Sequence, residues 1–173
     1  TYPCNLMLIA SMNPCKCGYY GSTQKACTCT PNELNRYRNK ISGPLLDRID
    51  IQVNVSEVAY RDLDSPQKPE SSAEIKERVD RAREIQLKRY HGLGIYSNAQ
   101  LTAGLLSEFC RLGEAESKIL NIAFDKLGLS ARAYSRILKV ARTIADLDSS
   151  ENILSKHIAE ATQYRNLDRN YFS

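Results

Sequence analysis

The chain has 173 residues, 42% of them apolar and 25% charged, with a formal net charge of +4. This composition allows a packed core, and it excludes a disordered, highly charged chain. No apolar run approaches the roughly 18 residues of a membrane span, so we expect no membrane partner. We also expect no signal peptide in this stretch. Because the chain begins at Thr1 and enters an apolar run almost at once, we expect it to be a piece of a longer protein.

The first third of the sequence reads as part of an α/β domain. LMLIA, residues 6–10, is a continuous apolar run, typical of a strand buried on both faces in a parallel sheet. Thr30 to Glu33 has the pattern of a capping box with proline at the first helical position, so a polar helix should start there. A short helical turn should follow Ser42. IDIQVNV, residues 49–55, alternates in polarity and predicts a half-buried strand.

The rest of the sequence reads as helical. SPQKPE, residues 65–70, predicts a linker, so we expect an α/β part over 1–64 and an all-α bundle over 71–173. Capping residues and glycine stops predict helices over 71–91 before Gly92, about 103–110, 114–127 before Gly128, 131–147 capped by Ser130, and 156–165 capped by Ser155.

Two polar residues stand at positions where an α/β domain presents functional groups. Asn13 lies just past the carboxyl end of the first expected strand, where open sheets bind ligands, although it can equally form a turn before Pro14. Arg48 lies between a short helix and a strand. It can pair with a neighbouring aspartate or extend toward an anion, for which its planar guanidinium is suited.

Basic residues recur along the expected helix 131–147. Arg132, Arg136, Lys139 and Arg142 follow one another at spacings of four, three and three, so they share one face, and no acid occurs between Asp125 and Asp146. A solvated basic face is the plainest interpretation. Arg132 differs by its position in the first turn, where the helix end also favours an anion.

Four of the six cysteines form two C-x-C pairs, Cys15 with Cys17 and Cys27 with Cys29. Two extended segments joined through Gly18 to Ser22 would place the four sulfurs on one side, as a tetrahedral zinc site requires. Disulfides and free thiols remain alternatives, because the usual zinc knuckle is C-x-x-C. The clustered spacing is more typical of an intracellular site than of a secreted scaffold, so we expect a cytoplasmic protein.

The order of these motifs resembles a known family. NPCKCGYYG, SGPLLDRID, ESSAEI and LSARAYSRILKVARTIADL are similar to runs found in AAA+ ATPases of the magnesium-chelatase and MCM branch, in particular the magnesium-chelatase-like proteins of the ComM/YifB type. The resemblance extends from residue 4 to about residue 169.

The resemblance implies roles for individual residues. Asn13 looks like sensor 1, which orients the attacking water. Arg48 looks like the arginine finger offered to the neighbouring subunit, and Arg132 like the sensor 2 arginine, with Arg136 beside it at the nucleotide. A finger in trans implies a hexameric ring of copies of this protein, with ATP and Mg²⁺ bound by the full-length protein. Relatives of this type are implicated in DNA branch migration, so DNA is the partner that the resemblance implies.

The sequence also lacks two motifs that ATP hydrolysis needs. No G-x-x-x-x-G-K-[ST] occurs, and no apolar run ends in Asp-Glu. We therefore expect the C-terminal part of such an ATPase, inactive on its own. Three alternatives remain: a zinc-hairpin module that binds nucleic acid, a metal-chelatase-type remodelling ATPase, and a helical domain that only docks on another protein.

Overall fold

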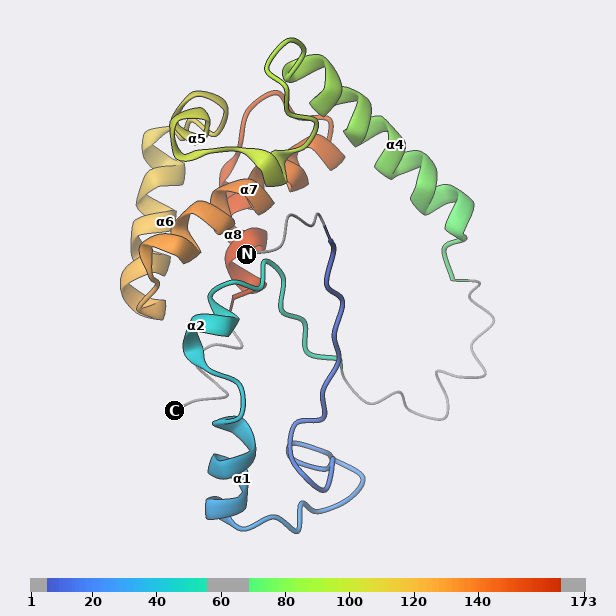
Figure 1. Ribbon diagram of the computed structural model, residues 1–173, viewed down its shortest axis with the longest axis vertical. Coiled ribbons are helices and arrows are strands. Elements are labelled where there is room, and N and C mark those ends of the chain that lie inside the picture. The colour runs from blue at the N-terminus through green and yellow to red at the C-terminus, as the bar shows by residue number, and fades with distance from the viewer. Residues whose placement is uncertain (1–5, 56–68, 166–173) are drawn as a thin grey trace. The chain divides into compact units, whose positions relative to one another are not determined.

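A computed structural model describes residues 6–55 and 69–165 of the chain. The described residues up to Ser42 form one compact unit, and those from Gly43 onward form a second. The elements, in chain order, are α1 (Pro31–Arg38), α2 (Gly43–Leu46), α4 (Ser72–Arg89), the 3-10 helix η1 (Asn98–Gln100), α5 (Ala103–Phe109), α6 (Glu114–Leu127), α7 (Ala131–Leu147) and α8 (Ser155–Gln163) (Figure 1). None of these helices is long and apolar enough to cross a membrane.

The two expected strands are not formed in the described part of the chain. Residues 6–10 and 49–55 lie in irregular structure, and no strand occurs within 6–55 or 69–165. Met7 and Ile9 are 85% and 83% exposed, and Val55 is 85% exposed. A strand needs a neighbouring strand to accept its backbone hydrogen bonds, and none is present among these residues. The α/β part of the expected fold is therefore not confirmed, whereas the helical part is.

The helix starts and stops follow the local sequence signals closely. Thr30 with Glu33 and Ser71 with Glu74 both form the expected reciprocal capping boxes. Helix α6 ends at Gly128, whose φ of 55° is left-handed and therefore suited to glycine. The Ser130 hydroxyl accepts the N–H of Ala133 at 3.2 Å, as expected for the cap of α7.

The start of the last helix differs from expectation. We expected Ser155 to cap it, but Ser155 is the first helical residue and its hydroxyl donates to Glu116 Oε1 at 2.7 Å. Instead, the N–H of the N-cap residue Leu154 donates to Nδ1 of His157 at 3.0 Å. A histidine three residues into the helix therefore takes the place that glutamate holds in an ordinary capping box.

Helix α7 is the centre of the second unit. It packs against α8, α4, α5 and η1, and α6 packs against α8 (Figure 1). Ala133, Ala141 and Ala145 are completely buried on α7, so these small side chains let neighbouring helices approach closely. The other buried apolar residues of the core are Tyr90, Leu101, Leu106, Cys110, Leu120, Leu129, Ile137, Leu138, Ile153, Ile158 and Ala161.

The domain boundary that the linker predicts stays a prediction. Most of the segment 65–70 lies outside the described residues. Residues 43–52, which we assigned to the α/β part, lie in the same compact unit as the helical bundle.

Candidate functional site

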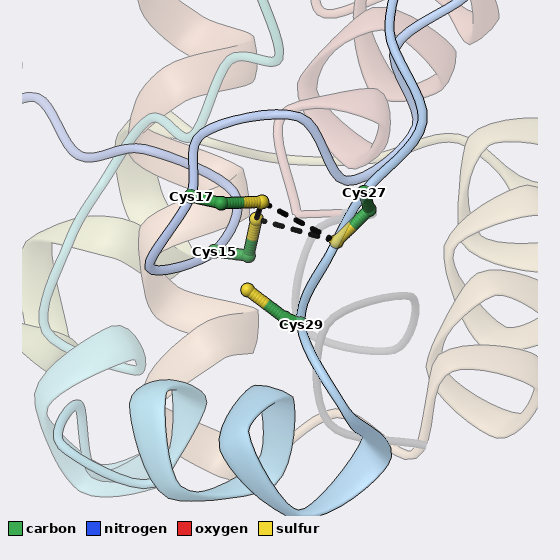
Figure 2. A group of neighbouring side chains, drawn as sticks. All are labelled: Cys15, Cys17, Cys27 and Cys29. Atoms are coloured by element: carbon green, nitrogen blue, oxygen red, sulfur yellow. Dashed lines mark hydrogen bonds between the residues drawn. The ribbon is translucent and has the colours of Figure 1, made fainter.

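The four cysteines of the two C-x-C pairs converge in the first unit. Their Sγ atoms all lie within 4.8 Å of one another and point toward a common centre (Figure 2). Cys15 and Cys17 are 3.3 Å apart, Cys17 and Cys27 3.5 Å, and Cys15 and Cys27 3.7 Å, measured between Sγ atoms. All four are free thiols.

A tight turn, rather than a strand hairpin, brings the first pair into place. The N–H of Gly18 donates to the carbonyl of Cys15 at 3.1 Å, and Gly18 has a φ of 86°, which suits glycine. The second pair leads directly into Thr30, the cap of α1. Lys16 Nζ lies 3.6 Å from Oε1 of Glu33, which forms the capping box of α1 with Thr30. An ion pair therefore joins the cysteine loop to the start of α1.

Backbone amides of the loop also stabilise thiolates. Hydrogen bonds from the backbone at Tyr19 and Thr28 lower the pKa of Cys17 to about 5. A backbone hydrogen bond from Cys29 favours the thiolate of Cys27, but partial desolvation and the adjoining thiols outweigh it and raise the pKa of Cys27 to about 12. A cation at the centre of the four sulfurs would favour their thiolate forms.

The sulfur geometry fits a tetrahedral metal ion. With Zn–S bonds of about 2.3 Å, the edges of a ZnS₄ tetrahedron measure about 3.8 Å. The three closest sulfur pairs span 3.3–3.7 Å, and all pairs lie within 4.8 Å. Small shifts of flexible side chains would therefore satisfy zinc. Cys15, Cys17, Cys27 and Cys29 are the residues that would hold it.

The first unit has little else to hold it together. Among the described residues 6–42, only Cys15 and Arg38 are buried. This part of the chain therefore has no apolar core. A loop of this kind gains its stability from a cross-link or a metal rather than from hydrophobic burial.

The residues that the sequence linked to nucleotide fall in both units. Asn13 is exposed in the first unit, and the Cβ of any larger residue at Gly18 would lie 3.9 Å from its Nδ2. Arg48 is exposed in the second unit, where its Nη1 donates to the carbonyl of Pro44 at 2.6 Å. Arg132 is exposed in the first turn of α7.

The basic face of α7 is not the uniform solvated face that its spacing suggests. Arg136 forms an ion pair with Asp50. Lys139 Nζ donates to the carbonyl of Ala99 at 2.8 Å, and desolvation together with Arg136 lowers its pKa. Arg142 is buried. Of these four residues, only Arg132 is exposed.

Arg142 belongs to a buried polar network that the sequence did not reveal. Its Nε donates to Asp146 Oδ1 at 3.2 Å, and its terminal nitrogens donate to the carbonyls of Ser150 and Glu151. Arg89, at the end of α4, pairs with the same carboxylate. The i,i+4 spacing of Arg142 and Asp146 was the available signal, but it does not indicate burial.

A second set of contacts fixes the segment around Arg48 to the helical bundle. Arg165, which is 1% exposed, donates to the carbonyl of Ile49 and lies 3.6 Å from Asp47. The N–H of Gln52 donates to the carbonyl of Tyr164 at 3.0 Å. These contacts join residues more than 100 positions apart in the sequence, so no local pattern predicts them.

Together, the helical bundle centred on α7 and the preceding cysteine loop define a two-part chain, and both parts match the same class of protein. Residues 1–63 match the family model "Magnesium chelatase, subunit ChlI", and residues 69–165 match "Magnesium chelatase, subunit ChlI C-terminal". The chain therefore belongs to the magnesium-chelatase-like family, and within it to the ComM/YifB type.

Curated relatives match nearly the whole chain. It is 42% identical over 170 residues to the uncharacterized protein YifB of Escherichia coli and 38% identical over 169 residues to the competence protein ComM of Haemophilus influenzae. It is also 32% identical over 167 residues to an uncharacterized protein of Mycobacterium tuberculosis. These matches cover 95–98% of this chain, and the chain spans about a third (32%) of the length of each relative.

Proposed function

We propose that this chain supplies the sensor, arginine-finger and lid portion of a ring-forming AAA+ ATPase that remodels DNA. The observation that carries the proposal is the family membership of both parts of the chain, combined with its span of about a third of each relative. The phosphate-binding loop and the magnesium carboxylate would lie in the remainder of the longer protein. ATP and Mg²⁺ would bind there, and the chain alone would not hydrolyse ATP.

The exposed apolar segments support this arrangement. Leu6, Met7, Leu8 and Ile9 are 65–85% exposed, and Ile51, Val53 and Val55 are 52–85% exposed. The continuous apolar run at 6–9 is typical of a strand covered on both faces, and the alternating run at 51–55 of a strand covered on one face. We propose that both segments become strands of the nucleotide domain when the rest of its sheet is present.

Exposed arginines support the proposed nucleotide roles. Phosphoryl transfer places negative charge on the γ-phosphate oxygens, and an arginine supplied in trans can be worth about 10³–10⁵ in rate. Arg48, as the finger, would serve the neighbouring subunit of a hexamer, whereas Arg132 would contact the nucleotide of its own subunit. Asn13 would orient the attacking water. Arg136 is held by Asp50, which argues against direct contact with the nucleotide.

The substrate is proposed from the relatives. One of them is named a competence protein, which fits a motor that acts on DNA during uptake. The family description names a chelatase, so remodelling of a metal-insertion complex is the alternative.

The decisive test is ATP hydrolysis by the longer protein, with and without branched DNA, beside its Arg48→Ala variant. We expect DNA to stimulate hydrolysis and the variant to lose most of it, while the 173-residue chain alone shows none. Hydrolysis that requires Arg48 but ignores DNA would favour the chelatase-type alternative. Hydrolysis unaffected by Arg48→Ala would refute the proposed role of the finger.

We also propose that the four cysteines bind one structural zinc ion. The supporting observation is the convergence of four free thiols in a unit without an apolar core. Purified chain should contain one zinc per molecule by elemental analysis, and Co²⁺ should give the intense visible bands of tetrahedral thiolate coordination. Cys17→Ser should reduce both signals. Cys110→Ala, which changes a buried thiol of the helical core, is the matched control and should retain the metal.

A second candidate function for the cysteine loop is binding of single-stranded nucleic acid. Lys25 lies over the ring of Tyr19 at 4.5 Å, and Arg38 over the ring of Tyr20 at 4.6 Å. Basic and aromatic side chains together suit stacking on bases beside a phosphate backbone. Salt-dependent binding of a single strand by the isolated chain, reduced by Tyr20→Ala, would support this function.

A further inference from the structure

The structure places Arg48 between residues that the helical bundle holds. Asp47 and Ile49, its two sequence neighbours, are both contacted by Arg165. Asp50, two residues after Arg48, is paired with Arg136 of α7. The backbone that carries Arg48 is therefore fixed on both sides by guanidinium groups that lie more than 80 residues further along the chain.

Helix α7 connects this anchor to Arg132. Arg136 lies four residues after Arg132, so the two side chains emerge from the same face of the helix, one turn apart. A shift or rotation of α7 that follows a contact at Arg132 must also move Arg136 and, through it, Asp50. Arg48 and Arg132, both exposed, are thus joined by one helix and one ion pair.

The ion pair between Arg136 and Asp50 is too exposed to hold the fold together. Arg136 and Asp50 are 31% and 57% exposed, and an exposed pair of this kind contributes little to stability. Arg165, at 1% exposure, is better placed to hold the segment against the bundle. Losing the Arg136–Asp50 pair should leave the fold intact and change only the position of the loop around Arg48.

We propose that Arg136 and Asp50 are positioning residues that link the nucleotide contact at Arg132 to the arginine finger at Arg48. The inference rests on the proposed function of Arg48 and Arg132. In a ring, Arg132 would contact its own subunit's nucleotide and Arg48 would reach the neighbour's. The pair would then couple the nucleotide bound at one site, through α7, to the position of the finger that serves the next site.

The test uses the longer protein with Asp50→Ala, Arg136→Ala and the charge exchange Asp50→Arg/Arg136→Asp. The pair is exposed, and losing an exposed ion pair changes a rate by about fivefold at most, so each single variant should lower kcat about two- to fivefold. The KM for ATP should remain within about twofold, because interactions made mainly in the transition state affect kcat. The exchange should restore at least half of the rate, and Arg136→Lys, which keeps the charge, should be intermediate.

Controls separate this proposal from the proposed function. Arg81→Ala breaks an exposed pair with Glu77 on α4 and should leave kcat unchanged. Loss of activity in Arg48→Ala with none in Asp50→Ala or Arg136→Ala would overturn the link and leave the finger in place. Single variants that lose activity without rescue by the exchange would also overturn it. Full activity in Arg48→Ala would remove the proposed function and the link together.

Discussion

The carboxylate of Asp146 on α7 pairs with the guanidinium of Arg89 at the end of α4, with Nη1 of Arg89 3.0 Å from Oδ2 of Asp146. The Asp146 side chain is fully buried, and Arg89 is 16% exposed. Arg142 donates to the same carboxylate from within α7. One buried carboxylate thus joins the end of α4 to the central helix and is shared by two arginines.

Replacement of Asp146 by alanine should be strongly destabilising. It would leave Arg142, 3% exposed, without its carboxylate partner, and breaking a buried pair in this way costs about 3–5 kcal/mol. The measurement is the free energy of unfolding in urea. Asp80→Ala, which breaks an exposed pair with Lys76 on α4, is the control and should change it by less than about 1 kcal/mol. Equal losses in the two variants would contradict the role of the buried network.

Helix boundaries could be predicted because their signals are local. The bounds expected for α7, 131–147, are those observed, and the capping boxes at Thr30 and Ser71 form as expected. Each depends on residues within one turn of the helix end. The strands at 6–10 and 49–55 could not be verified in the same way, because a strand depends on partners that are distant in sequence.

In the candidate site, too, features set by local spacing could be predicted, and contacts between distant residues could not. The convergence of Cys15, Cys17, Cys27 and Cys29 followed from their spacing, and the structure brings them together. The partners of the arginines on α7 could not be predicted from residue spacing. The spacing placed Arg136 and Arg142 on one face, but it did not reveal that Asp50 pairs with one and Asp146 with the other.

Removal of the metal should unfold the first unit alone. Because residues 6–42 lack an apolar core, a chelator should abolish hydrogen-exchange protection in the cysteine loop and α1. Amides of α7 should keep theirs, since its core contacts lie in the second unit. Exchange measured by mass spectrometry with and without chelator tests this prediction. Loss of protection throughout both units, or in neither, would refute it.

Acid should weaken the helix starts. The pKa of Glu74 is lowered by hydrogen bonds from the hydroxyl and N–H of Ser71, and that of Glu33 by the N–H and hydroxyl of Thr30. A carboxylate whose folded pKa is lowered contributes stability above its unfolded pKa of about 4.3 and loses it as the pH falls through the folded value. The melting temperature should therefore fall progressively below about pH 4.3.

A single variant tests the origin of this acid sensitivity. Glu74→Gln keeps an acceptor for the Ser71 N–H but cannot titrate, so the difference in melting temperature between it and the parent should shrink below about pH 4. A constant difference across the whole pH range would show that the Glu74 carboxylate does not cause the effect.

His157 should act as a helix cap. Its Nδ1 accepts the N–H of Leu154, so the ring proton is on Nε2, which donates to Asp148 Oδ2 at 3.1 Å. The side chain is 2% exposed. His157→Ala should lose both the cap and buried contacts, at a cost of about 1–3 kcal/mol in the free energy of unfolding.

Two further substitutions separate the cap from the packing of His157. Glutamine three residues after an N-cap can also accept its N–H, so His157→Gln should retain more than half of the stability that alanine loses. Lys156→Ala removes the other partner of Asp148, at 2.6 Å on the surface, and should cost less than about 1 kcal/mol. If glutamine proves as damaging as alanine in urea unfolding, the shape of the buried ring, rather than its hydrogen bond to Leu154, stabilises the start of α8.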